Sequence, residues 1–191
     1  MTLVPCHSKP RLVPGARRQA MLKRWLIPLL VAAAVAAAIF WFGKSPEEGA
    51  FPGNRMPSFA VMDLQGQLVT ADAFGGKPLF INFWATWCEP CRYEMPEIQE
   101  LYDQAGGAFE VVAVSDEPLP TVQRYLDAYG YTFPVFLDVD RSMNQDFLVR
   151  ALPTSVFVDA RGIIREVHVG QLTREQMEAY LARIVPGMGR R

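Results

Sequence analysis

The chain has 191 residues, half of them hydrophobic, which is enough for one compact domain with extensions and excludes an intrinsically disordered protein. Its net charge of −1 hides an uneven distribution, because six of the 19 Lys and Arg residues lie in the first 43 residues, where there is no Asp or Glu. The remainder therefore has 13 bases against 20 acids, a net charge of −7, which argues against nucleic acid as a partner.

The N-terminal part has the pattern of a membrane anchor. Residues 1–24 are basic and lack hydrophobic periodicity, which predicts a disordered cytoplasmic tail. Residues 25–43 form an apolar run without charge, long enough to cross a bilayer as one helix. The positive-inside rule keeps the N-terminus in the cytoplasm and exports everything after Lys44, to the periplasmic or extracytoplasmic side of the cytoplasmic membrane. A cleaved signal peptide is the alternative, since residues 36–38 are alanines, but the apolar run continues past them to Phe42.

The exported part begins with a linker, residues 44–55, which is polar and contains two prolines and two glycines. The domain of residues 56–187 then starts with an expected hairpin at 59–69 and a helical turn at 70–74. The apolar run 79–84, interrupted only by Asn82, predicts a central strand that is buried on both faces. A helix ending at Gly106 and a second apolar run at 109–114 follow, and this strand–helix–strand pattern predicts two parallel strands.

The rest of the domain continues the α/β pattern. We expect a helix at 119–128, a short strand at 134–137 and a helical segment at 140–148. Residues 154–158 and 163–169 predict a hairpin around a turn at 159–162. Thr173 and Gln176 form a capping box that starts the last helix, which runs to Ile184.

Cys88 and Cys91 lie at the junction of the expected central strand and its helix, with two residues between them. This arrangement is typical of a dithiol redox site. The chain lacks a second pair of cysteines for a zinc site, so we expect no metal. A disulfide that closes a two-residue loop restrains little chain entropy, which argues against a purely structural role. Cys6, in the tail, lies on the other side of the predicted membrane span.

The position of the two thiols predicts their roles. Cys88, at the start of the helix, faces free backbone N–H groups and the positive end of the helix dipole, both of which favour a thiolate nucleophile. Cys91, one turn further in, is the resolving thiol that releases the reduced partner. Pro90 stiffens the loop without losing a hydrogen bond. Glu89 places a negative charge beside the nucleophile and favours a reductant. The redox-active disulfide is then the only cofactor needed.

Glu94 follows Cys91 by three residues and therefore lies near it on the helix. Two readings are open from this spacing. A desolvated carboxyl group would move a proton to or from the buried thiol, whereas an exposed one would only stabilise the first turn through the helix dipole.

Residues 83–96, with the sequence FWATWCEPCRYEMP, resemble the active-site segment of the membrane-anchored thioredoxin-like oxidoreductases of the TlpA and ResA type, including those of cytochrome c maturation. The similarity runs from about Met56 to Ile184. It implies a thioredoxin fold with an N-terminal β-hairpin and a helix–strand insert at 119–137. It also implies that Leu152 and Pro153 form a cis-proline loop opposite the thiols, whose backbone pairs with the substrate chain.

The same resemblance implies a functional acid at Glu94, which favours the proton-handling reading. Trp87, just before the nucleophile, is expected on the partner-contact surface with Glu89 and Pro90. Asn82 occupies the place of a buried aspartate in classical thioredoxins, so we interpret it as a hydrogen-bonded core amide. His168, in the last hairpin, is interpreted as structural.

Three functions follow as hypotheses. The first is a monomeric disulfide reductase that receives electrons from a membrane thiol transporter and passes them to apocytochrome c or a metallochaperone. The second is a peroxiredoxin-like peroxidase, but its Pro-x-x-x-Thr-x-x-Cys motif is not matched, because Thr86 lies two residues before Cys88. The third is a non-enzymatic assembly or metal-binding module, which the acidic domain and the anchor would suit.

Overall fold

A computed structural model describes residues 28, 31–33 and 47–188. The chain divides into two units, Met1–Ser45 and Pro46–Arg191, and the account below concerns the second. The predicted tail 1–24 lies outside the described residues, and so does the predicted span 25–43 except for residues 28 and 31–33, which are helical. No helix within the described ranges is both long and apolar enough to cross a bilayer.

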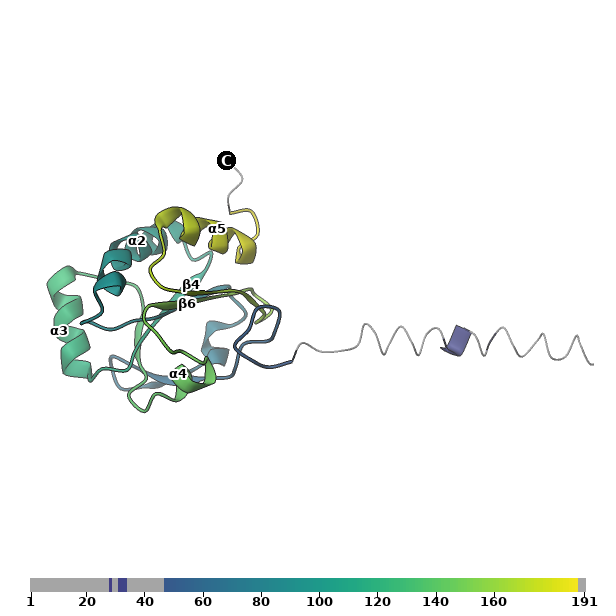
Figure 1. Cartoon of the computed structure of the whole chain (residues 1–191), viewed down its shortest axis with the longest axis horizontal. Coiled ribbons are helices and arrows are strands. Elements are labelled where there is room, and N and C mark those ends of the chain that lie inside the picture. The colour runs from purple at the N-terminus through teal and green to yellow at the C-terminus, as the bar shows by residue number, and fades with distance from the viewer. Residues whose placement is uncertain (1–27, 29–30, 34–46, 189–191) are drawn as a thin grey trace, which may run out of the picture. The chain divides into compact units, whose positions relative to one another are not determined.

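One mixed sheet of seven strands, in the order β2-β1-β5-β4-β3-β6-β7, forms the centre of the second unit (Figure 1). The strand β3 runs parallel to β4, and β4 runs parallel to β5, whereas all other neighbours are antiparallel. This confirms the predicted α/β class and the predicted parallel pair. The strands are β1 (Ala60–Asp63), β2 (Leu68–Thr70), β3 (Leu79–Phe83), β4 (Glu110–Ser115), β5 (Val135–Leu137), β6 (Thr154–Val158) and β7 (Ile164–Val169).

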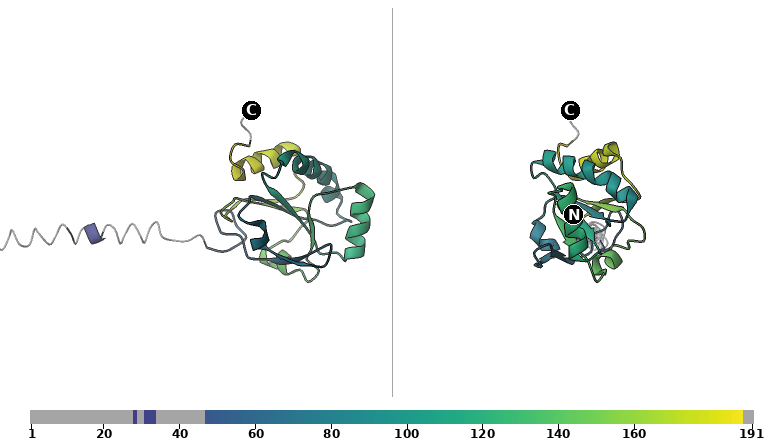
Figure 2. Two further views of the ribbon diagram at one scale, coloured as in Figure 1. Left: turned by 180° about the vertical axis from the view of Figure 1, so that it is seen from behind. Right: turned by 90° about the vertical axis from the view of Figure 1, so that its left-hand side faces the viewer.

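Helices cover both faces of the sheet. They are the 3₁₀ helix η1 (Ala71–Phe74) and the α-helices α2 (Glu89–Ala105), α3 (Leu119–Tyr129), α4 (Ser142–Asp146) and α5 (Arg174–Ile184). The helices α2 and α5 lie side by side on one face, and α4 lies on the other (Figures 1 and 2). The expected helix–strand insert is present: α3 and β5 lie between β4 and the last hairpin, which β6 and β7 form.

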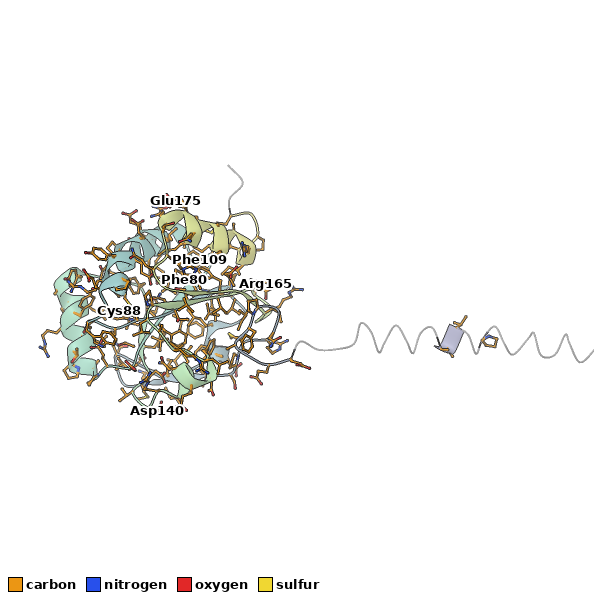
Figure 3. All side chains as sticks on the ribbon, in the orientation of Figure 1. Phe80, Cys88, Phe109, Asp140, Arg165 and Glu175 are labelled. Carbon is orange, nitrogen blue, oxygen red and sulfur yellow. A yellow bond between two sulfur atoms is a disulfide. The ribbon has the colours of Figure 1, made fainter. Side chains whose placement is uncertain are left out.

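The strand β3 separates two apolar clusters, because its side chains alternate between the faces of the sheet. Phe80 packs into the cluster shared with α2, α3 and α5, and its ring stacks on Phe157 of β6 with centroids 4.6 Å apart (Figure 3). Ile81 and Phe83 pack into the second cluster, with η1 and α4. All five residues of β3 are buried, as the unbroken apolar run predicted. Asn82 consequently points to the α2 face.

The predicted elements are confirmed, with shifts at their ends. Gly106 ends α2 in the left-handed region, with φ 54°, where glycine has no steric penalty. The capping box of Thr173 and Gln176 is present at the start of α5. The helix α4 is shorter than the expected segment 140–148 at both ends, because Arg141 before it and Leu148 after it have positive φ values of 63° and 54°, outside the helical region.

The described part of the predicted linker packs against the domain. Gly53 N–H donates to the Ile164 carbonyl at 2.8 Å, and Ile164 N–H donates to the Asn54 carbonyl at 2.9 Å. Arg55 forms an isolated bridge with Ile163, at the start of β7. Residues 53–55 therefore pair with the edge strand of the sheet.

Candidate active site

Cys88 and Cys91 form a disulfide at the point where the chain leaves β3 and enters α2 (Figure 3). Cys88 is the N-cap residue of α2, and its sulfur accepts a hydrogen bond from the Cys91 N–H at 3.3 Å. Pro90 occupies the first turn, where a missing N–H leaves no intrahelical acceptor unpaired. The Cys88 sulfur thus lies at the helix N-terminus, as its position in the sequence predicted.

The two cysteines differ in access. Cys88 is 4% exposed and Cys91 is fully buried, so a partner reaches Cys88 first. Trp87, one residue earlier, is 71% exposed, and Glu89 and Pro90 are exposed too. These three exposed residues flank Cys88 in the chain.

Glu94 is fully buried in α2, one helical turn after Cys91. Its Oε1 accepts a hydrogen bond from the Asn82 side-chain amide at 2.7 Å, and its Oε2 accepts one from the Leu172 N–H at 2.9 Å. Burial raises the pKa of Glu94 from 4.5 to about 7, although both hydrogen bonds act in the opposite direction. The reading of Glu94 as an exposed first-turn carboxylate is therefore wrong.

Asn82 is the hydrogen-bonded core amide that was expected. The register of β3 and β6 places Asn82 opposite Ser155. Its amide nitrogen donates to the Ser155 hydroxyl at 3.0 Å as well as to Glu94. Asn82 thus holds one oxygen of the buried carboxyl group in place.

The Leu152–Pro153 peptide bond is cis, as the resemblance implied. Phe83, the last residue of β3, pairs with Thr154, so Pro153 lies beside the segment that leads from β3 to Cys88. Leu152 is half-buried and Pro153 is buried. The loop and the disulfide therefore occupy the same end of the sheet.

Glu117 is a residue of this site that the sequence reasoning missed. Its Oε2 accepts a hydrogen bond from the Thr86 N–H at 2.6 Å, and its Oε1 accepts one from the Thr86 hydroxyl at 2.8 Å. Thr86 lies two residues before Cys88, so the carboxylate holds the loop that leads to Cys88. A signal was available, because Glu117 follows β4, and the carboxyl ends of neighbouring parallel strands meet at one edge.

His168 lies away from this constellation. It is on β7, and its ring is 6.0 Å from that of Tyr180 on α5. Within residues 28, 31–33 and 47–188 no group of three His, Cys, Asp or Glu side chains is placed to hold a metal ion. The chemistry that this arrangement offers is exchange between the Cys88–Cys91 pair and another disulfide or dithiol.

Comparison with known proteins identifies the family of the chain. The AhpC/TSA family model matches residues 52–167. The chain is 33% identical over 168 residues to the thioredoxin-like protein YneN of Bacillus subtilis (strain 168), which covers 84% of this chain and 98% of that protein. It is 34% identical over 172 residues to the thiol-disulfide oxidoreductase ResA of Bacillus thuringiensis (strain Al Hakam), which covers 89% of this chain and 99% of that protein.

Among solved structures, a thiol:disulfide interchange protein DsbE from Chlorobium tepidum superposes with a TM-score of 0.66 at 26% identity. The match covers 70% of this chain and 97% of that one. These findings confirm the resemblance that was drawn from residues 83–96. The chain therefore belongs to the AhpC/TSA family, and it is a thioredoxin-fold thiol-disulfide oxidoreductase of the ResA type.

Proposed function

We propose that the chain reduces disulfides in client proteins on the extracytoplasmic side of the cytoplasmic membrane, with residues 25–43 as its anchor. One observation carries the proposal. Cys88, 4% exposed, is the N-cap of α2, and Cys91 and Glu94, both fully buried, follow it along the helix at intervals of one turn. A nucleophile that keeps some exposure, followed by a buried resolving thiol and a buried proton acceptor, is the arrangement that releases a reduced client.

The exchange begins from the dithiol form. The Cys88 thiolate attacks one sulfur of the client disulfide, the client sulfur–sulfur bond breaks, and the departing client sulfur takes a proton. A mixed disulfide between Cys88 and the client results. The helix N-terminus supports this step because it stabilises the thiolate before the attack.

The second step needs a proton acceptor inside the protein. Cys91 gives its proton to the Glu94 carboxylate and attacks the Cys88 sulfur, so the Cys88–Cys91 disulfide re-forms and the bond between Cys88 and the client breaks. The client sulfur leaves as a thiolate and takes a proton from the solvent, and Glu94 later returns its proton to the solvent. Two electrons have then passed from the dithiol to the client. A carboxyl group with a pKa of about 7 suits this transfer, because it is partly ionised at neutral pH and is ready to accept and return a proton.

The enzyme must be reduced again after each turnover. We propose a membrane thiol-electron transporter as the donor, and apocytochrome c or a metallochaperone as the client. The similarity to ResA supports a protein client, and Trp87, Glu89 and Pro90 with the Leu152–Pro153 loop supply the surface that it would contact. The loop backbone is proposed to pair with the client chain.

A trapping experiment tests the reductase. The full chain with Cys91→Ser, in a Cys6→Ser background, should accumulate a reductant-sensitive adduct with its client through Cys88. The matched control is Cys88→Ser in the same background, which lacks the nucleophile and should form no such adduct. Equal adduct levels in both variants would contradict the assigned roles.

The direction of electron flow has its own measurement. Equilibration of the full chain, in the same Cys6→Ser background, with a dithiol buffer should give a reduction potential below about −200 mV, in the reducing part of the range of known dithiol proteins. A potential near that of strong oxidants, about −120 mV, would make the protein an oxidase of client thiols instead.

A further inference from the structure

A pocket of about 390 Å³ opens beside the disulfide, between the first turns of α2 and the end of α3. Glu89, which lies between the two cysteines in the sequence, is one of the residues that line it, so the pocket reaches the segment that joins Cys88 to Cys91. We refer to it as the tyrosine–arginine pocket; it is lined by Glu89, Arg92, Tyr93, Pro96, Tyr125, Tyr129 and Tyr131.

The walls of the pocket are aromatic rings that hold one another in place. The rings of Tyr125 and Tyr129 have centroids 4.6 Å apart, and those of Tyr129 and Tyr131 are 5.9 Å apart and nearly parallel. Tyr125 also contacts Trp84, at the end of β3, with centroids 5.4 Å apart. One wall of the pocket therefore rests on the buried core through Trp84, whereas Arg92, Tyr93 and Tyr129 are exposed.

Hydrogen-bond donors converge on this pocket. Arg92 donates one bond to the Tyr129 hydroxyl, at 3.3 Å, and none of the described carboxylates lies within 4.0 Å of its guanidinium. The Tyr125 hydroxyl oxygen is buried and has no hydrogen-bond partner among the described residues. Tyr129 accepts from Arg92, so its own hydroxyl proton is available to a ligand.

The protonation states of these groups keep them as hydrogen-bond donors. Burial raises the pKa of Tyr125, and it raises the pKa of Tyr131 to about 12, so both hydroxyls remain neutral donors at physiological pH. The hydrogen bond to Tyr129 raises the pKa of Arg92, which keeps its positive charge. The pocket thus combines the positive charge of Arg92 and neutral tyrosine donors with one carboxylate, Glu89, which accepts a hydrogen bond from the Tyr93 hydroxyl at 3.4 Å.

We propose that the tyrosine–arginine pocket is a client-recognition subsite that binds an acidic side chain close to the disulfide attacked by Cys88. A carboxylate has two oxygens that can accept from Arg92 and from the tyrosine hydroxyls together. A basic side chain would stack on the tyrosine faces but would bring its charge against Arg92. The domain is acidic overall, so an acidic client side chain is attracted to Arg92 and repelled by most of the remaining surface. This contrast would fix the position in which the client chain binds.

This inference rests on the proposed reductase function, and a peptide experiment tests it separately. The substrates are disulfide-bridged peptides made in pairs, with Glu in one member and Gln in the other at a single position. From pair to pair this position moves from three residues before the first cysteine to three residues after the second. The reduced full chain is mixed with each peptide, and the second-order rate is divided by the rate with dithiothreitol to remove intrinsic differences.

For the wild-type chain we expect the Glu peptide to react about fivefold faster than its Gln partner at one or two positions, a modest preference because Arg92 is exposed to solvent. Arg92→Gln should abolish this preference, and Tyr125→Phe should reduce it. Arg124→Gln is the matched control: it removes the same charge from an exposed residue of α3 outside the pocket and should retain the preference.

The outcomes separate the two proposals. Equal rates for every Glu and Gln pair with the wild-type chain would overturn the subsite and leave the reductase intact. A preference that survives in Arg92→Gln would also overturn it. Failure to reduce any peptide faster than the Cys88→Ser variant does would overturn the proposed function itself.

Discussion

Glu94 is a buried carboxyl group whose charge is only partly compensated. It has two hydrogen-bond donors, the Asn82 amide and the Leu172 N–H, and no cationic side chain bonds to it among the described residues. Desolvation therefore dominates, and the pKa rises to about 7. The same group that is proposed to handle protons is consequently a cost to the folded state at neutral pH.

This cost predicts a pH dependence of stability. Between pH 4.5 and 7 the carboxyl group of the unfolded chain is ionised while that of the folded chain keeps its proton, so stability falls as pH rises. At 1.36 kcal/mol per pKa unit, the oxidised wild-type protein should lose about 3 kcal/mol of unfolding free energy between pH 4.5 and 8, relative to Glu94→Gln. Urea unfolding at several pH values measures this difference.

Glu47→Gln is a suitable control, because Glu47 is exposed and should not reproduce the trend. A difference between wild type and Glu94→Gln that is flat with pH would show that the carboxyl group titrates as in the unfolded chain. The Glu94→Gln variant should also reduce client disulfides about a hundredfold more slowly, as the loss of a general base typically costs.

The sequence predicts some residues of the site fully and others only in part. The chemistry of Cys88 and Cys91 follows from their spacing and their place at a helix start. Glu94 left two readings, because helical spacing says that it is near Cys91 but not whether water reaches it. Its burial depends on the tertiary packing of α5, and of the segment that precedes α5, against α2. The tyrosine–arginine pocket also escaped prediction, since its rings come from α2, α3 and the segment after α3.

At the level of elements, a single carboxylate joins the ends of two strands. Glu117 follows β4, and both of its oxygens accept hydrogen bonds from Thr86, in the loop after β3. The loop from β3 to α2 is short and carries Cys88, so its position depends on few contacts. Glu117 supplies two of them.

Removing this carboxylate should loosen the loop. Glu117→Ala leaves the N–H and hydroxyl of Thr86 without their acceptor and should lower the unfolding free energy by about 1–3 kcal/mol. Glu117→Gln keeps one acceptor oxygen and should lose less. Chemical unfolding at pH 7 measures both.

Asp146→Ala serves as the matched control for this pair, because Asp146 is exposed and accepts no hydrogen bond in the described part of the chain. If Glu117→Ala is no less stable than Asp146→Ala, the bonds to Thr86 contribute nothing to folding. A Glu117→Ala protein that also exchanges disulfides more slowly would show that the loop positions Cys88.

The elements themselves were predictable because hydrophobic periodicity is strong here. β3 is buried on both faces, and its unbroken apolar run indicated a central strand. The capping box at Thr173 and the glycine after α2 marked helix ends through local chemistry. The end of α4 was missed, because nothing in the local sequence signals the positive φ of Leu148.

For the whole molecule, the expected membrane topology is a separate prediction. The full chain should remain in the membrane pellet after alkaline carbonate extraction, because residues 25–43 are long and apolar enough to span the bilayer. Its mass should include those residues. A soluble product that begins shortly after residue 38 would instead identify a cleaved signal peptide.

The pairing of residues 53–55 with β7 has a consequence for self-association. Exposed edge strands offer unpaired backbone groups to other chains and are sites of aggregation. At one edge β2 has only three residues, and at the other the bonds of Gly53 and Asn54 to Ile164 already occupy the first part of β7. A fragment that begins at the predicted domain boundary, Met56, would lose these bonds and expose the backbone groups of Ile164 to other chains, so a fragment for expression should begin no later than Glu47.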